Sequence, residues 1–180
     1  KLRSLKGIWF QGCGLNQATG KGLMMLNGSL NRLSQLEEIS LEVSDTEGMT
    51  DQSLESIDFK RLVSLRKVAL AFATSPQLTD RGMYFITQRL KGLPNLQEIE
   101  LNLWECPEFG DLSLHYIWEM MKTLPCLKDI NVQFSECSRM SDAGLDDINN
   151  TLMKCLIQLK KFRLEFYRCE SITDSGISYL

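Results

Sequence analysis

The 180-residue chain has a single histidine, His115, and this scarcity limits the chemistry that it can support. Metal sites built on histidine, and Ser-His or Cys-His catalysis, are hard to assemble from one imidazole. None of the motifs HExxH, paired CxxC or GxSxG occurs in the sequence. The segment ATGKG at 18–22 does not complete a phosphate-binding loop, because position 15 is leucine and position 22 is glycine. We therefore expect no enzymatic activity, no cofactor and no metal site.

The sequence also lacks an excess of basic residues and any long apolar run. Lys and Arg total 20 against 23 Asp and Glu, for a net charge of −3, so the basic footprint of a nucleic acid-binding protein is missing. No apolar run reaches the roughly 18 residues of a membrane span. The first residues, KLRSLKGIWF, lack the apolar core of a secretory signal. These figures predict a folded protein that does not bind nucleic acid and has no membrane span.

What the sequence does contain is one pattern, present six times. Its clearest copy, LEEISLEV, recurs as LRKVALAF, LQEIELNL, LKDINVQF and LKKFRLEF, after an earlier and more diverged copy, LKGIWFQG. The copies are 29–32 residues apart and begin at Leu5, Leu36, Leu65, Leu96, Leu127 and Leu159. A second motif follows each of the last five, as in LTDRGM, with an aspartate 15 residues after the leading leucine: Asp51, Asp80, Asp111, Asp142 and Asp174. Such a fixed spacing indicates a repeat protein.

Each unit changes its hydrophobic period once. After the leading leucine, apolar residues alternate with others, as in Ile39, Leu41 and Val43, which predicts a strand with one buried face. Beyond the aspartate the period becomes helical, and the apolar residues three positions on are Leu54, Met83, Leu114, Leu145 and Ile177. The Thr/Ser-Asp pair lies where a helix N-cap or a first-turn carboxylate would be. We therefore expect the aspartates to be structural.

The full pattern, LxxLxLx(n)CxxITDxGLxxL, resembles the leucine-rich repeat in its long, cysteine-containing or ribonuclease inhibitor-like form. The best copy, LKKFRLEFYRCESITDSGI, covers 159–177, and the resemblance extends over essentially the whole chain. The units are slightly longer than is usual for such repeats, and the first copy has glycine at position 20 instead of aspartate. The resemblance implies an α/β solenoid, built as a single array over 1–180. Its last repeat is truncated, so we expect a segment of a larger protein.

The dimensions of strands and helices predict the shape of such an array. Parallel strands stack about 4.8 Å apart, whereas neighbouring helix axes need about 8–10 Å. A stack of strand-plus-helix units must therefore curve into a horseshoe arc. The parallel β-strands are expected on its concave face and the α-helices on its convex face.

Three of the six cysteines hold one place in the repeat, five residues before the aspartate: Cys106, Cys137 and Cys169. Thr46 and Ser75 hold it in earlier units. Side chains stacked in a column do not converge on a metal ion, so we expect buried structural thiols. The other three are scattered: Cys13, Cys126 and Cys155. Free thiols favour a reducing, cytoplasmic compartment, although N-glycosylation sequons at 27–29 and 149–151 weigh weakly against it.

Residues between the buried strand positions point out of the predicted concave face. Trp104 should stand between the small residues Ala73 and Ser135, as an exposed aromatic anchor for a partner. The alternative is that Trp104 only packs down on its neighbours. Acidic residues outnumber basic ones on this face. Its candidate partner-binding residues are Trp104, Tyr167, Arg163, Trp9, Glu98, Glu100, Asn102 and Asn131.

These features predict a non-catalytic scaffold that binds a protein partner through its concave strand face or its loop edge, as part of a larger assembly. A second hypothesis is the substrate-recognition repeat domain of an F-box-type ubiquitin-ligase adaptor, because CxxITDxGL resembles the repeats that follow an F-box. A regulator of a nuclease or of a small GTPase is allowed by the fold. An F-box before Lys1 would favour the adaptor, and further repeats or a coiled coil would favour the scaffold.

Overall fold

The computed structural model describes residues 4–14, 20–30, 32–46, 48–146, 148, 151 and 158–179. It shows an α/β protein in which six strands alternate with helical segments along the chain. In chain order the elements are β1 (Gly7–Cys13), α1 (Gly20–Leu30), β2 (Glu38–Ser44), α2 (Asp51–Glu55), β3 (Lys67–Ala71), α3 (Asp80–Leu90), β4 (Glu98–Trp104), α4 (Asp111–Met121), β5 (Asp129–Ser135), the 3-10 helix η1 (Asp142–Leu145), β6 (Lys161–Tyr167) and α6 (Asp174–Ile177).

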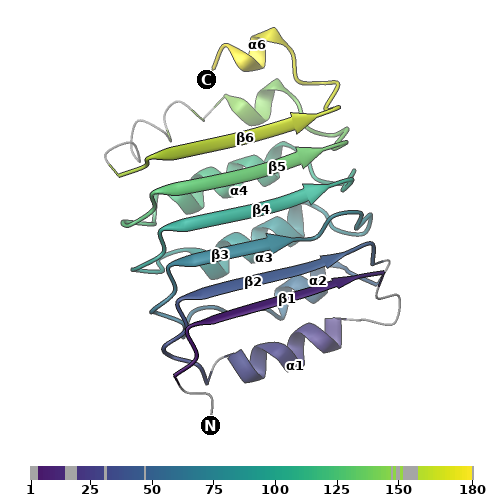
Figure 1. Ribbon diagram of the computed structural model, residues 1–180. Helices are drawn as coiled ribbons and strands as arrows, with labels where there is room; N and C mark the ends of the chain where they lie inside the picture. Colours follow the sequence, from purple (N-terminus) through teal and green to yellow (C-terminus); the bar gives the residue numbers. More distant parts are fainter. Residues whose placement is uncertain are drawn as a thin grey trace.

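All six strands form one open sheet in the order β1-β2-β3-β4-β5-β6, and every neighbouring pair is parallel. The helices lie on one side of the sheet and leave its other side uncovered (Figure 1). We call the uncovered side the strand face. Parallel neighbours need a crossover connection, and the described helices of these crossovers lie on the same side. The predicted α/β architecture of parallel strands alternating with helices is therefore confirmed, in a form compatible with a solenoid-like arrangement.

The strand register places equivalent residues of successive units side by side. Leu41 pairs with Phe10 on one side and with Leu70 on the other, and Leu101 pairs with Val132. Leu41, Leu70, Leu101 and Val132 are at most 1% exposed. The alternation in the sequence therefore predicts the buried face of the central strands correctly.

Burial decreases at both ends of the sheet. Leu164 of β6 holds the same place as Leu41 but is only partly buried. Ile177 of α6, predicted to face the core, is 58% exposed. The reason is that the end units have a neighbouring unit on one side only. β1 and β6 each have one strand neighbour, and no described helix packs beyond α6. Leu180, the next apolar position of that unit, lies outside the described residues.

Each strand is followed by a residue in the left-handed conformation, which the sequence does not indicate. It lies nine positions after the leading leucine and has φ between 53° and 64°. The six residues are Gly14, Asp45, Thr74, Glu105, Glu136 and Arg168. Residues other than glycine rarely adopt this conformation. In the first five units the backbone N–H donates to a carbonyl at the end of the next strand, as from Thr74 to Trp104 at 2.7 Å, so pairing between units holds the turn.

Candidate interaction surface

The cysteine ladder (Cys106, Cys137 and Cys169) lies directly after these turns and is buried. The three thiols donate in turn to carbonyls of the preceding unit, at Phe72 (3.1 Å), Leu103 (3.7 Å) and Phe134 (3.5 Å). Burial raises the pKa of Cys106 to about 11. The hydrogen bond with Cys169, together with burial, raises the pKa of Cys137. The hydrogen bond with Cys137 lowers the pKa of Cys169 to about 7. All three thiols therefore satisfy backbone carbonyls, and Cys106 and Cys137 stay protonated. All five cysteines among the described residues are free; Cys155 lies outside them.

We expect thiol labelling to separate Cys106 and Cys137 from Cys13, which is exposed. In the native protein at neutral pH, iodoacetamide should modify Cys13 first, and Cys106 and Cys137 only on unfolding, because the thiolate is the reactive form and burial disfavours it. In denaturant all six cysteines of the sequence should react as free thiols. Peptide mass spectrometry reports the site and rate. A disulfide-linked peptide, or equal native rates at Cys13 and Cys106, would contradict this expectation.

The repeat aspartates connect each unit to the next one. Asp111 accepts two hydrogen bonds from Ser141, one from the backbone N to Oδ1 and one from the hydroxyl to Oδ2, both at 2.7 Å. The same two bonds recur in two further pairs, Asp51 with Thr79 and Asp142 with Thr173. The bonds from Thr173 hold the pKa of Asp142 below its ordinary value. Each aspartate thus begins its own helix and also fixes the N-cap residue of the next.

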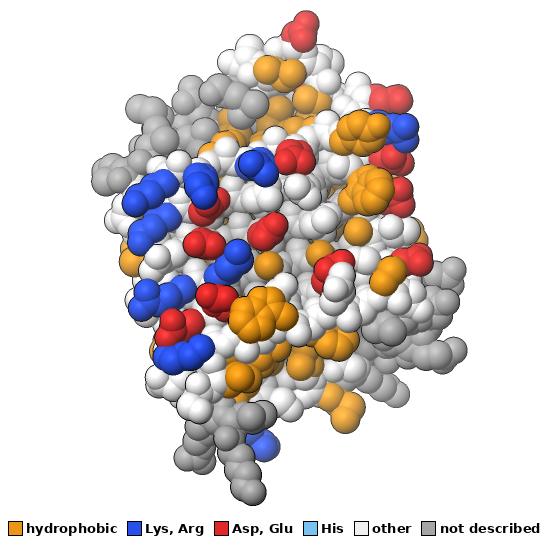
Figure 2. All heavy atoms as spheres, viewed as in Figure 1, with side chains coloured by type: hydrophobic (Ala, Val, Ile, Leu, Met, Phe, Trp, Pro, Cys, Tyr) orange, Lys and Arg blue, Asp and Glu red, His pale blue; other side chains and the backbone are white. Residues whose placement is uncertain are grey.

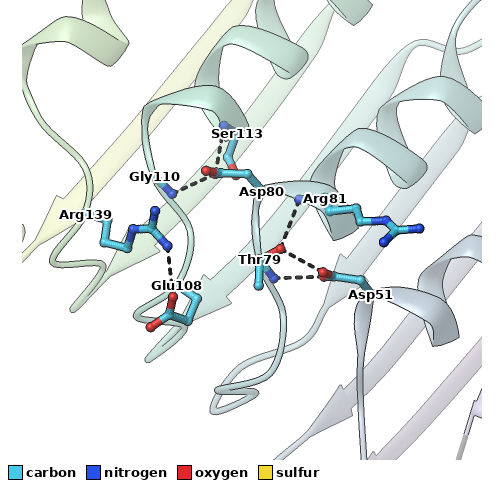
Figure 3. Close-up of polar contacts among 8 residues, drawn as sticks. All are labelled: Asp51, Thr79, Asp80, Arg81, Glu108, Gly110, Ser113 and Arg139. Atoms are coloured by element: carbon cyan, nitrogen blue, oxygen red, sulfur yellow. Dashed lines mark hydrogen bonds and ion pairs between the residues drawn. The ribbon is translucent and has the colours of Figure 1, made fainter.

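One unit uses a different donor for this connection. The N-cap of α4 is Gly110, which has no hydroxyl. Asp80 Oδ1 accepts instead from the hydroxyl of Ser113 at 2.5 Å, and from the backbone N atoms of Gly110 (2.8 Å) and Ser113 (3.1 Å) (Figure 3). In other units the N-cap has a hydroxyl and the preceding unit has the repeat aspartate. There the residue equivalent to Ser113 is a glycine, as at Gly82 and Gly144. The connection therefore needs one hydroxyl, in either of two places.

An aromatic rim lies at the C-terminal ends of three strands and consists of Trp104, Ser135 and Tyr167. The register places Ser135 between Trp104 and Tyr167. Trp104 is 47% exposed and Tyr167 is 57% exposed. The guanidinium of Arg168 lies 5.2 Å from the ring centre of Tyr167, and the side chain of Asn102 accepts from the backbone N of Trp104 at 3.3 Å. The rim is an accessible apolar strip on regular strands.

Trp9, another predicted binding residue, lies apart from this rim. It is on β1, three strands from β4, and is 70% exposed. Its ring lies over Gly7, since a Cβ built on Gly7 would overlap with Trp9 Cη2. Phe10 beside it is 41% exposed, although the strand alternation places it on the buried face. Trp9 and Phe10 therefore form a separate exposed apolar patch on the edge strand, and the predicted binding residues do not form one cluster.

The N-terminal ends of β4, β5 and β6 surround a hollow of about 580 Å³. Four predicted residues meet here: Glu98, Glu100, Asn131 and Arg163. Lys67 and Lys161 also line it, and they pair with Glu98 at 3.4 Å and with Asp129 at 3.2 Å. Two residues that the sequence reasoning placed on one face, Trp104 and Arg163, thus belong to opposite ends of the strands.

Two lysines near this hollow are missing from the predicted set. Lys128 and Lys160 each follow the leading leucine of a unit, just before the strand begins. Strand alternation predicts which residues within a strand are exposed and does not extend to these two positions, although the dipeptide Leu-Lys at 127–128 and 159–160 is a usable signal. We call the resulting group the basic corner: Lys128, Lys160, Lys161 and Arg163. Basic side chains gather at this side of the strand face with acidic ones among them, and acidic ones are also frequent toward the opposite side (Figure 2).

A second hollow, of about 480 Å³, lies on the helix side of the sheet, between α3 and α4. Tyr84 and Leu112, which line it, are 41% and 55% exposed. The ring of Tyr84 is 5.3 Å from that of Tyr116. The buried stripe of each helix does not indicate which exposed residues lie together, so the sequence pattern does not predict this cluster. Tyr84 is therefore an exposed aromatic residue on the helix side, with which Trp104 of the strand face can be compared.

Comparisons with known proteins do not assign this chain to a family. No protein-family model and no curated protein sequence matches the chain. Within the described residues, no group of three or more His, Cys, Asp or Glu side chains is placed to hold a metal ion. None of the helices that the structure describes has the length and apolar character required to cross a bilayer. The candidate surface is therefore defined by its own geometry, an aromatic rim and a charged hollow at opposite ends of the strands.

Proposed function

We propose that this chain is a leucine-rich repeat array that acts as a non-catalytic scaffold in a reducing compartment. It binds a protein partner through the strand face, which is the concave side of the arc. The six units begin 29–32 residues apart, and each has one strand and one helical segment, which supports the repeat assignment. A regular sheet places side chains at fixed spacings without the ordering cost of a loop, which favours binding through this surface.

The observation that carries the proposal is the exposure of Trp104. A tryptophan that is 47% exposed leaves a large apolar surface in water, and aromatic residues of this kind dominate the energetics of interfaces. Its neighbours on either side, Ala73 and Ser135, are too small to cover it. Tyr167 extends the apolar surface beyond Ser135. A partner side chain can therefore reach Trp104 from the open side of the sheet.

Affinity capture with the native full-length protein tests this proposal. Trp104→Ala should cost a captured partner about 2 kcal/mol, roughly a thirtyfold loss of affinity, because it removes a central aromatic contact. The melting temperature should stay nearly unchanged, since the side chain is half in solvent. Tyr84→Ala is the matched control, as Tyr84 is also an exposed aromatic residue but lies on the helix side.

Two outcomes would count against the strand face. A large loss of melting temperature with binding intact would mean that Trp104 only packs against its own sheet. Loss of the partner in Tyr84→Ala but not in Trp104→Ala would place the interface on the helix side.

A further inference from the structure

The basic corner (Lys128, Lys160, Lys161 and Arg163) has more positive charge than its surroundings neutralise. Within it, Lys161 pairs with Asp129 at 3.2 Å. Lys128 binds the neutral side chain of Gln97 at 2.8 Å. Lys160 is exposed and makes no ion pair within the part of the chain that the structure describes.

Arg163 is also available for a partner. Its nearest carboxylate oxygen, on Glu165, is 3.9 Å away, and its side chain is 68% exposed. A pair this long and this exposed has little energy of its own. Beside it in the register is Asn131, whose Oδ1 is buried and accepts no hydrogen bond from the described residues. Among the described residues, the hollow therefore offers an unpaired lysine, Lys160, next to a weakly paired arginine, Arg163.

The opposite ends of the strands have the opposite charge. The turn residues Asp45, Glu105 and Glu136 lie there, and Glu165 and Glu42 lie just before the ends of their strands. Arg168, the cation among the described turn residues, is paired with Glu136 at 2.9 Å. The strand face is thus polarised along the strand direction, positive where β5 and β6 begin and negative where the strands end.

We propose that the basic corner binds an acidic side chain of the protein partner whose apolar residue contacts the aromatic rim. This inference rests on the proposed function and adds the orientation of the partner to it. Arg163 and Tyr167 are four residues apart on β6, which corresponds to about 13 Å. The partner should therefore present a carboxylate and an apolar side chain roughly this far apart, with the carboxylate toward the beginning of the strands.

The hollow itself limits where the carboxylate can sit. Glu100 lines the hollow from β4 and has no ion pair among the described residues, so it repels an anion there. The favourable place is above β5 and β6, where Lys160 and Arg163 donate to the carboxylate. Neighbouring acidic residues and the net charge of −3 make a nucleic acid backbone the poorer ligand for the same corner.

The corner can be tested directly with a hexaglutamate peptide and the 15N-labelled full-length protein. Amide shifts should concentrate on the first residues of β5 and β6. The double variant Lys160→Ala/Arg163→Ala should bind the peptide about fivefold more weakly, since each exposed ion pair is a modest contribution. Lys6→Ala is the matched control, because Lys6 holds the same place in its unit as Lys160 but is paired with Glu37. It should leave the affinity unchanged.

Three results would overturn this proposal: equal affinity of the double variant and the parent, an equal loss in Lys6→Ala, or tighter binding of a single-stranded hexanucleotide than of hexaglutamate. A dispersed amide spectrum checks that each variant is folded, and Lys160→Glu alone provides a second variant, since Lys160 is exposed. Capture of the native partner separates the two proposals. If Trp104→Ala loses the partner and the double variant retains it, the proposal for the basic corner is wrong and the proposed strand-face function stands. If both variants retain the partner, both proposals are wrong.

Discussion

Gly144→Ala is expected to lower the free energy of unfolding by about 2 kcal/mol, through overpacking at a junction between units. Gly144 is buried in η1, and a Cβ there would lie 2.7 Å from Asp111 Oδ1 and 2.7 Å from Leu114 Cδ1. It would also lie 3.2 Å from the Cα of Asp111. Because that Cα belongs to α4, relief requires a shift that disturbs the hydrogen bonds from Ser141. Urea unfolding followed by circular dichroism measures the change.

Gly22→Ala is the matched control for this change. Gly22 lies two residues after position 20, just as Gly144 lies two residues after Asp142. Apart from the backbone of its own helix and its two chain neighbours, none of the described residues has an atom within 4 Å of a Cβ built on Gly22. Inside α1 the alanine should stabilise the helix by up to about 1 kcal/mol. The two variants should therefore change stability with opposite signs. Equal losses would show that the contact with the preceding aspartate is not the cause.

The second large effect is expected for Asp80→Ala, which should cost about 2–3 kcal/mol. The change removes the acceptor of the Gly110 N–H and of the Ser113 hydroxyl. Ser113 is fully buried, so water does not replace the lost partner. The N-terminus of α3 also loses a favourable charge. The same unfolding experiment gives the size of the loss.

Asp174→Ala separates the connection between units from the effect of a charge at a helix end. Asp174 holds the same place at the start of α6, but it is exposed and binds no later N-cap among the described residues. Its loss should cost less than about 1 kcal/mol, the usual range for a helix-terminal charge. If Asp174→Ala and Asp80→Ala had equal effects, the aspartates would act on their own helices only.

The connection also predicts a rescue at the α3–α4 junction. Ser113→Gly removes the hydroxyl that Asp80 accepts and should destabilise the protein by about 1 kcal/mol or more. Adding Gly110→Thr to that variant restores the arrangement seen at Thr79 and Thr173, so it should recover most of the loss. A double-mutant cycle at 110 and 113 measures the coupling. If the effects of Ser113→Gly and Gly110→Thr on stability were simply additive, a hydroxyl at position 110 would not replace the one at position 113.

The sequence predicts the elements of the fold because their periods are local. Alternation at Ile39, Leu41 and Val43 requires only that one side of a strand be buried, and the equal spacing of the units then brings equivalent strands together. The partners of the aspartates are not local. The bond from Thr79 to Asp51 joins residues 28 positions apart, so it becomes visible only when the units are stacked.

The candidate site was harder to predict than the fold. Which residues point out of the strand face follows from alternation, and this includes Trp104 and Arg163. That the two lie at opposite ends of the face follows only from the strand direction and register. The exposure of Phe10 and the place of Lys160 depend on where the sheet ends and on residues just outside the strands. A pattern averaged over the repeat does not distinguish such positions.

The left-handed residues after the strands separate the stability of this protein from its specificity. Their conformation is nearly the same for Asp45, Thr74, Glu105 and Arg168, with φ between 53° and 56°. Backbone hydrogen bonds to the following strand hold it in the units that have one. Side chains as different as those of Asp45, Thr74, Glu105 and Arg168 are therefore compatible with the turn. Drift or selection can rewrite the chemistry of this edge, one residue in each unit, while the scaffold beneath it stays the same.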